Sequence, residues 1–211
     1  MNNTEKTKSF WSSSFAAKLY RKFGGKRFFK MHEEIAKQVI ERNPKNLLDI
    51  ACGPGDFLSY LADLDLNINL NGTDIAPEMV RHASQKLSTK AKILESKGEK
   101  QPFPENSFDV ITIMLAFHHF PKKLETLQQI KKLLRLNGLF IIGDVVAKSR
   151  LQKKIWNCLE RIISIRGYIG HYTENDIKEL AKKAGFSVSI EYIPDMPKRY
   201  RICKFALEKT L

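Results

Sequence analysis

The sequence predicts an α/β protein in which helices cover a parallel β-sheet. Between residues 46 and 146, short runs of β-forming residues alternate with helical patterns, as in parallel strands joined by crossover helices. A glycine-rich turn, Cys52-Gly53-Pro54-Gly55, follows the first run and leads into a helical pattern. A last pair of runs near the carboxyl end predicts an antiparallel hairpin that closes the sheet.

The elements of the parallel region can be placed one by one. Its five strands are expected at residues 46–51, 68–73, 91–95, 108–114 and 139–145. A helix is expected at 122–135, because leucine and isoleucine recur there at spacings of three and four residues. Asn137-Gly138 is expected to end this helix.

The carboxyl-terminal elements follow from capping and turn signals. A helix is expected at 174–184, where Thr173 and Asp176 have the capping-box spacing and Gly185 can end the helix. The hairpin strands are expected at 186–193 and 200–207.

The charge of the chain is unevenly distributed. The 211 residues carry a formal net charge of +13. Residues 1–30 hold 8 basic and 1 acidic side chain, and residues 147–172 hold 6 and 1, while residues 31–146 hold 14 and 15. The part of the chain that contains the glycine turn is therefore nearly neutral, and two flanking segments carry most of the positive charge.

Several classes of protein are not expected. No run approaches the ~18 apolar residues of a membrane span, and the first residues lack the apolar core of a signal peptide. Three widely spaced cysteines, Cys52, Cys158 and Cys203, form no CxxC pair, so neither a disulfide framework nor a metal site is expected. We therefore expect a cytoplasmic protein.

The glycine turn limits the ligands that it can hold. A dinucleotide-binding turn would have a third glycine where this chain has Leu58. Asp56 stands at the helix start, where a carboxylate repels pyrophosphate, and no Gly-Lys-Ser/Thr phosphate loop follows. Asp49 and Asp56 would instead suit a ligand with positive charge. The alternative is that the turn binds nothing.

An acidic residue ends the second expected strand. Asp74 lies 19 residues after Gly55, in the position from which a carboxylate can bind both hydroxyls of a ribose. Alone, such a residue is more often a helix cap. Together with the glycine turn it predicts a nucleoside site.

Four segments resemble, in order, the motifs of class I S-adenosylmethionine-dependent methyltransferases. They read LLDIACGPGDF, GTDIAPEMV, QPFPENSFDVITIMLAFHHF and LLRLNGLFIIGDV. The likeness covers about residues 45–190 and favours the small-molecule branch that includes quinone-biosynthesis C-methyltransferases. It implies a Rossmann-like seven-stranded sheet of order 3-2-1-4-5-7-6 flanked by helices. It also implies an N-terminal helical cap (1–45) and a methyltransferase domain (46–211) with a lid insertion (147–172) that forms a helix after strand five.

The resemblance implies S-adenosylmethionine as the cofactor and a set of residues around it. In the family pattern Asp49 lies near the ammonium group of the cofactor, Asp74 holds the ribose, and Met79 packs on the adenine. The residues expected to contact the cofactor are Asp49, Ala51, Gly53, Gly55, Asp74, Ile75, Met79, Gly98, Glu99 and Met114. Two positions depart from the pattern: Ala51 replaces a frequent glycine, and Ser96-Lys97 replaces a frequent Gly-Asp.

Candidate catalytic residues follow the fourth expected strand. Methyl transfer requires a base only when the acceptor must lose a proton. His118 and His119 would lie beside the cofactor methyl group and are the candidates for that role, and packing under the sheet edge is the alternative. The side chains expected near the acceptor are Tyr20, Asp144, Trp156, His171 and Tyr172.

The two basic flanks predict how the acceptor is covered. Residues 10–29 mix seven aromatic side chains with lysine and arginine, and residues 149–166 combine an aliphatic helical stripe with basic residues. In the resembling family these places form a lid, so we expect the two apolar surfaces to meet over the acceptor. Such segments suit an anionic or lipid-like acceptor, or peripheral contact with an anionic membrane.

The sequence thus predicts methyl transfer to a small hydrophobic or anionic acceptor. An RNA or protein methyltransferase that uses the basic face is one alternative. Nucleic acid is the less favoured acceptor, because residues 114–117 read Met-Leu-Ala-Phe and lack the Asn/Asp-Pro-Pro-aromatic loop that grips a flipped base. A cofactor-binding module without turnover is the other alternative.

Overall fold

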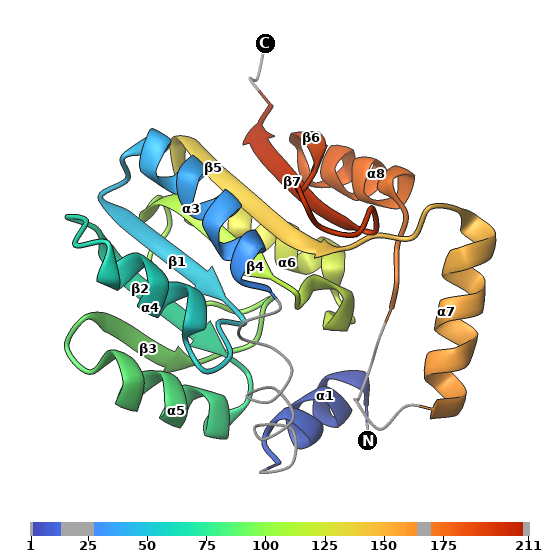
Figure 1. Ribbon diagram of the computed structural model, residues 1–211, viewed down its shortest axis with the longest axis horizontal. Coiled ribbons are helices and arrows are strands. Elements are labelled where there is room, and N and C mark those ends of the chain that lie inside the picture. The colour runs from blue at the N-terminus through green and yellow to red at the C-terminus, as the bar shows by residue number, and fades with distance from the viewer. Residues whose placement is uncertain (1, 14–27, 164–169, 209–211) are drawn as a thin grey trace.

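The computed structural model describes residues 2–13, 28–163 and 170–208 (Figure 1). Seven strands form one sheet in the order β3-β2-β1-β4-β5-β7-β6, which confirms the expected topology. Strands β1 to β5 pair in parallel, and β7 is antiparallel to both β5 and β6. The strands span Asn46–Ile50 (β1), Asn69–Asp74 (β2), Ala91–Glu95 (β3), Phe108–Met114 (β4), Leu134–Val145 (β5), Phe186–Tyr192 (β6) and Tyr200–Leu207 (β7).

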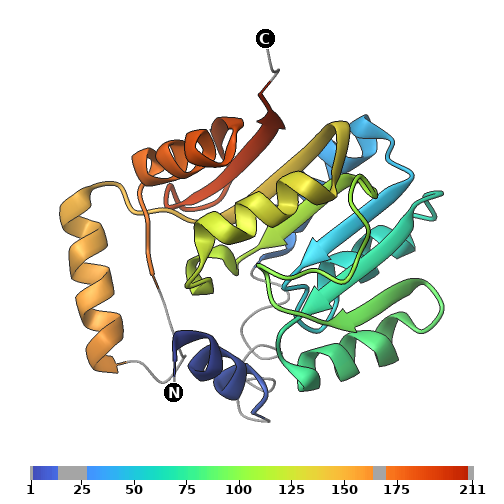
Figure 2. The same cartoon turned by 180° about the vertical axis from the view of Figure 1, so that it is seen from behind.

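Helices cover both faces of the sheet and produce three layers (Figures 1 and 2). The described helices are α1 (Asn3–Trp11), α3 (Phe29–Arg42), α4 (Asp56–Asp63), α5 (Pro77–Leu87), α6 (Lys123–Leu133), α7 (Arg150–Ile163) and α8 (Glu174–Ala184), with a 3-10 turn, η2 (Phe117–His119). Helices α3, α4 and α5 bury one face of the sheet, and α6 and α8 bury the other. Adjacent residues of a strand face opposite layers. In β1, Leu47 packs in the core on the side of α3, α4 and α5, and Leu48 packs in the core on the side of α6 and α8.

A glycine allows α4 to pack closely on β2. A β carbon added at Gly72 would lie 2.7 Å from Leu58 of α4, 2.8 Å from Ile93 of β3 and 2.9 Å from Cys52. Real β carbons essentially never approach other atoms so closely, so a larger residue here would force these three side-chain ends to move. The contact keeps the glycine turn after β1 against the end of β2.

The carboxyl ends of β1, β2 and β4 meet at one edge of the sheet, because these strands are parallel. The chain leaves β1 through the glycine turn, leaves β2 at Asp74 and leaves β4 at Met114. The motifs that lie far apart in the sequence are thereby brought to one place.

The boundary between α6 and β5 differs from the expectation. The helix ends at Leu133, and β5 begins at Leu134 rather than at residue 139. Leu134 pairs with Phe108 of β4 across a register shift, and it is buried in the core as a strand residue. Asn137-Gly138 therefore lies within β5 and does not end the helix. The expected helix was too long because the helical spacing of leucine continues to Leu134, whereas pairing with β4 holds Leu134 in an extended strand.

The flanking segments are described in part. Helix α3, in the expected cap, buries Met31, Ile35 and Val39 against the sheet and so belongs to its first layer. The expected contact between residues 10–29 and the aliphatic stripe falls mostly outside the described residues, as does Tyr20. None of the described helices is both long enough and apolar enough to cross a membrane.

Candidate cofactor and acceptor site

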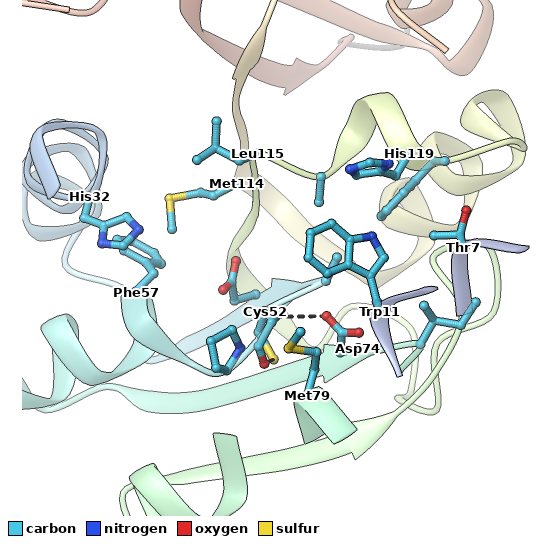
Figure 3. A pocket seen from close by; sticks show the side chains of 17 residues that line it. Thr7, Trp11, His32, Cys52, Phe57, Asp74, Met79, Met114, Leu115 and His119 are labelled. Atoms are coloured by element: carbon cyan, nitrogen blue, oxygen red, sulfur yellow. Dashed lines mark hydrogen bonds between the residues drawn. The ribbon is translucent and has the colours of Figure 1, made fainter. Parts of the chain in front are cut away.

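A pocket that is partly open to solvent lies where β1, β2 and β4 end (Figure 3). Helix α1 contributes to its wall. Of the residues that the sequence predicted for the cofactor or for catalysis, the pocket is lined by Asp49, Ala51, Gly53, Asp74, Ile75, Met79, Met114 and His119. Motifs from three strand ends therefore converge on one cavity.

The turn after β1 adopts the left-handed backbone region at three positions. The φ angles are 58° at Ala51, 55° at Gly53 and 79° at Gly55. Ala51 thus occupies a conformation that favours glycine, the residue frequent there in the resembling family. An added β carbon would meet nothing within 4 Å at Gly53, but at Gly55 it would lie 2.9 Å from Leu87. Gly53 is open to a ligand, whereas Gly55 lies outside the pocket lining and serves packing on α5.

Asp74 ties β2 to this turn. Its carboxylate accepts the backbone N–H of Gly53 at 2.9 Å and that of Ala76 at 2.9 Å. Burial raises the pKa of Asp74 to about 6, although these backbone donors favour the ionised form. Asp74 does not cap α5, because the N-cap residue is Ala76 and no side chain makes a capping hydrogen bond there. Each oxygen keeps a second lone pair that can accept a hydroxyl group.

Asp49 is a second buried carboxylate in the pocket. The Thr112 hydroxyl donates to it at 2.7 Å. Burial raises the pKa of Asp49 to about 7, and the neighbouring Asp74 charge adds to the increase. A positively charged group in the pocket would stabilise the ionised form. Asp56, which was also expected to suit such a ligand, is not in the pocket lining and pairs with Lys86 of α5.

Aromatic and apolar side chains outside the expected cofactor set complete the wall of the pocket, and Trp11 comes from the aromatic segment that was expected to cover the acceptor. Trp11 of α1 packs on Ala76 and Met79, and its ring meets the His119 ring edge-on at 5.6 Å. Figure 3 shows the Trp11 ring between His119 and Asp74. An ion pair between Lys8 and Glu95 attaches α1 to the end of β3. The capping box formed by Asn2 and Glu5 is the sequence pattern that could have predicted the start of α1.

His32 also lines the pocket, and no sequence pattern predicted it. It lies on α3, is 6% exposed, and its ring is 5.7 Å from that of Phe57. Burial lowers its pKa, so the neutral imidazole is favoured. No local motif marks it, because α3 reaches the pocket only through packing on the sheet.

The paired histidines of η2 point to different environments. His119 lines the pocket, whereas His118 is absent from its lining. The backbone N–H of His118 donates to Asp144 at 3.0 Å, and its Nδ1 lies 2.7 Å from the same carboxylate. The Tyr172 hydroxyl donates to Asp144 at 2.8 Å. Burial opposes ionisation, but the His118 charge and these donors outweigh it and hold the pKa of Asp144 below its ordinary value.

His171 and Trp156 extend the cluster around Asp144 toward α7. The His171 ring stacks on that of His118 with centroids 6.0 Å apart, and Trp156 meets His171 edge-on at 5.0 Å. Burial lowers the pKa of His171 to about 4, and its buried Nδ1 has no hydrogen-bond partner among the described residues. The expected acceptor residues Asp144, Trp156, His171 and Tyr172 are thus gathered, but outside the pocket lining.

Two expected cofactor residues also lie outside the pocket lining. A β carbon at Gly98 would be 2.7 Å from the Phe120 ring, so this glycine allows packing under the loop after β4. Glu99 pairs with Lys122 at 3.5 Å. The described residues contain no group of three or more side chains arranged to hold a metal ion.

Comparisons with known proteins agree with this geometry. Residues 48–142 match a family described as a methyltransferase domain. A demethylmenaquinone methyltransferase of Thermotoga maritima is 24% identical over 181 residues, which are 77% of this chain and 79% of that protein. The ubiquinone/menaquinone biosynthesis C-methyltransferase UbiE of Rickettsia bellii is 35% identical over 128 residues, 56% of this chain and 50% of that protein.

These likenesses support a class I S-adenosylmethionine-dependent methyltransferase. The crystal structure of the YcgJ protein from Bacillus subtilis has the same fold, with a TM-score of 0.72 and 16% identity over 85% of this chain and 100% of that one. The pocket of this methyltransferase fits its cofactor. Two buried carboxylates face a space suited to a nucleoside with an ammonium group, and the backbone at Gly53 is open to it.

Proposed function

We propose that this methyltransferase transfers the methyl group of S-adenosylmethionine to a small hydrophobic acceptor that carries an ionisable hydroxyl group. The observation that carries the proposal is the apolar wall beside His119. Trp11 of α1 meets the His119 ring edge-on, and Leu115 and Phe120 are also part of the pocket lining. A wall of this kind favours a compact, apolar acceptor, and the imidazole is the polar group beside it.

The cofactor is held by the strand-end residues in this proposal. Asp74 accepts the ribose hydroxyls, Asp49 attracts the ammonium group, and the backbone of Gly53 lies against the methionine part. Ile75 and Met79 pack on the adenine. The bound cofactor supplies a methyl group that is already activated, so the chain contributes mainly position.

In this proposal the imidazole of His119 acts as the base for the acceptor. His119 takes the proton of the acceptor hydroxyl, which raises the electron density of the attacking atom. His118 supports the position of His119. The Asp144 carboxylate holds the His118 ring, and the centroids of the two histidine rings are 4.2 Å apart. His118 is therefore a positioning residue, and His119 is the catalytic one.

The names of the relatives narrow the acceptor class. Two of them are named for demethylmenaquinone or for ubiquinone/menaquinone biosynthesis. A reduced quinone is a hydroxylated aromatic ring, which is the chemistry described above. The likeness to UbiE of Rickettsia bellii spans only half of that protein, so the acceptor is proposed by class alone.

Turnover assays test the proposal against its alternatives. Purified protein is incubated with labelled S-adenosylmethionine and, separately, with a short-chain demethylmenaquinol, total RNA or a protein extract. We expect label in the quinol. Label in RNA or protein alone would show a macromolecular acceptor, and binding of S-adenosylhomocysteine without any transfer would show a module that has no turnover. Either result contradicts the proposal.

A further inference from the structure

Helix α7 presents its aliphatic side chains to solvent. Leu151, Ile155 and Leu159 recur every four residues and therefore share one face of the helix. They are 67%, 49% and 47% exposed. We call these three residues the α7 ladder. On a surface helix such residues ordinarily face the core, so α7 is oriented the opposite way.

The contacts that attach α7 to the protein come from residues outside the ladder, among them Trp156, whose ring meets that of His171 edge-on. Lys153 pairs with Asp176 of α8 at 2.9 Å. The side-chain oxygen of Asn157 accepts the backbone N–H of His171 at 2.8 Å. Positions 153 and 157 lie across the helix from the α7 ladder at 100° per residue. The attachment thus holds the ladder outward, and Figures 1 and 2 both show α7 outside the layers of the sheet.

The charge of the segment that contains the ladder is mainly positive. Residues 148–163 contain five basic side chains and one acidic side chain, Glu160. Lys148, Arg150 and Lys154 are exposed. Lys154 lies beside the ladder, and Lys148 and Arg150 lie at the amino-terminal end of α7. An exposed aliphatic face with basic side chains near it is complementary to an anionic lipid surface, whose headgroups attract the charges and whose acyl boundary accepts the aliphatic groups.

We propose that α7 docks this methyltransferase on an anionic bilayer, with the α7 ladder in the acyl boundary and the basic side chains at the lipid phosphates. Nucleic acid would satisfy the charges but offers the aliphatic ladder no comparable apolar partner. The proposal does not depend on which acceptor is methylated, because it concerns only the outer face of α7.

Vesicle co-sedimentation tests the docking. The wild-type chain is mixed with vesicles of phosphatidylcholine alone and with vesicles in which phosphatidylglycerol replaces a third of the lipid. We expect binding to the anionic vesicles only, and weaker binding at high salt. The triple variant Leu151→Gln/Ile155→Gln/Leu159→Gln should bind at least about tenfold more weakly, since it removes the apolar contribution. Leu136→Gln, at a position 84% exposed on β5, is the matched control and should bind normally.

A second pair of variants tests the charges. Arg150→Gln/Lys154→Gln should lower the affinity for anionic vesicles roughly tenfold or more, at about 1 kcal/mol per basic residue near the surface. Lys132→Gln, an exposed lysine of α6, should have a smaller effect. Binding of S-adenosylhomocysteine should be unchanged in all variants, which separates this test from the test of the cofactor pocket.

Four results would overturn the docking proposal. The first is no binding of the wild-type chain to anionic vesicles. The second is unchanged binding of the ladder variant. The third is a wild-type dimer that the ladder variant converts to a monomer, which would assign the ladder to a second copy. The fourth is a ladder variant that melts several degrees below Leu136→Gln, which would show that the chain itself covers the ladder.

Discussion

At the scale of single residues, two buried carboxylates determine what the pocket can hold. Asp49 and Asp74 lie within the same apolar surroundings, and burial raises the pKa of both. Asp74 is already partly satisfied by two backbone donors, so its remaining lone pairs suit neutral hydroxyls. Asp49 has one hydroxyl donor and suits a cationic group. We therefore expect the two acids to bind different parts of one ligand.

Asp74→Ala should weaken binding of S-adenosylhomocysteine by about 1.5–3 kcal/mol, the range for hydrogen bonds to a charged group. Titration calorimetry measures the loss, and circular dichroism verifies that the variant is folded. Asp56→Ala is the matched control, because Asp56 pairs with Lys86 outside the pocket lining. Equal affinities of the two variants would remove Asp74 from the cofactor site.

His119→Gln should lower kcat on the order of 10²- to 10⁴-fold, the usual contribution of a general base, while the affinity for S-adenosylhomocysteine stays unchanged. Steady-state kinetics with the quinol acceptor measures the effect. His82→Gln, on the surface of α5, should behave as the wild type. An unimpaired His119 variant would mean that positioning alone supports the reaction.

At the scale of elements, the site depends on how closely helices approach the ends of the strands. Gly72 allows α4 to press against β2, and this contact supports the turn that carries Gly53. Helix α1 reaches the pocket from the other side through Trp11 and the pair between Lys8 and Glu95. The pocket is therefore formed between elements, and no single motif contains it.

Gly72→Ala should destabilise the fold by about 1–3 kcal/mol, because the new methyl group overpacks three neighbours at once. Urea denaturation measures the free energy of unfolding. Gly53→Ala provides a contrast: its methyl group meets nothing within 4 Å, and the cost is confined to the positive φ. If Gly72→Ala were as stable as the wild type, the close approach of α4 would not be required.

At the scale of the whole molecule, the pocket makes the ligand-free protein less stable as pH rises. The pKa of Asp49 is about 7 when folded, against an ordinary value of 3.8 that applies to the unfolded chain. Between these values the folded state holds a proton that the unfolded state has lost. The contribution of Asp49 to stability is therefore present at low pH and is lost as pH rises through about 4 to 7.

Asp49→Asn should remove this dependence, so the free energy of unfolding of the variant should fall less than that of the wild type between about pH 5 and pH 8. Urea denaturation across that range measures the difference. Asp56→Asn serves as the control. S-adenosylhomocysteine should also flatten the wild-type profile, because its ammonium group favours the ionised carboxylate. Parallel profiles for Asp49→Asn and the wild type would contradict the assignment.

The sequence by itself determined the sheet, the glycine turn and the strand-end acids. These features depend on patterns of a few neighbouring residues: strand runs, the turn at Gly53, and an acid directly after a strand. Parallel pairing then brings Asp49 and Asp74 together without further information. Local signals also placed α8, whose capping box and final glycine are as expected.

Only the tertiary structure decided which side chains complete the pocket and which way α7 faces. Trp11 and His32 reach the pocket from helices distant in the sequence, and pairing with β4 makes Leu134 a strand residue. The two histidines of η2 diverge: the Asp144 carboxylate contacts the His118 ring, and His119 lines the pocket. Amphipathic spacing defines two faces of a helix, but the partner that attaches to one of them, here Asp176 on Lys153, decides which face remains outside.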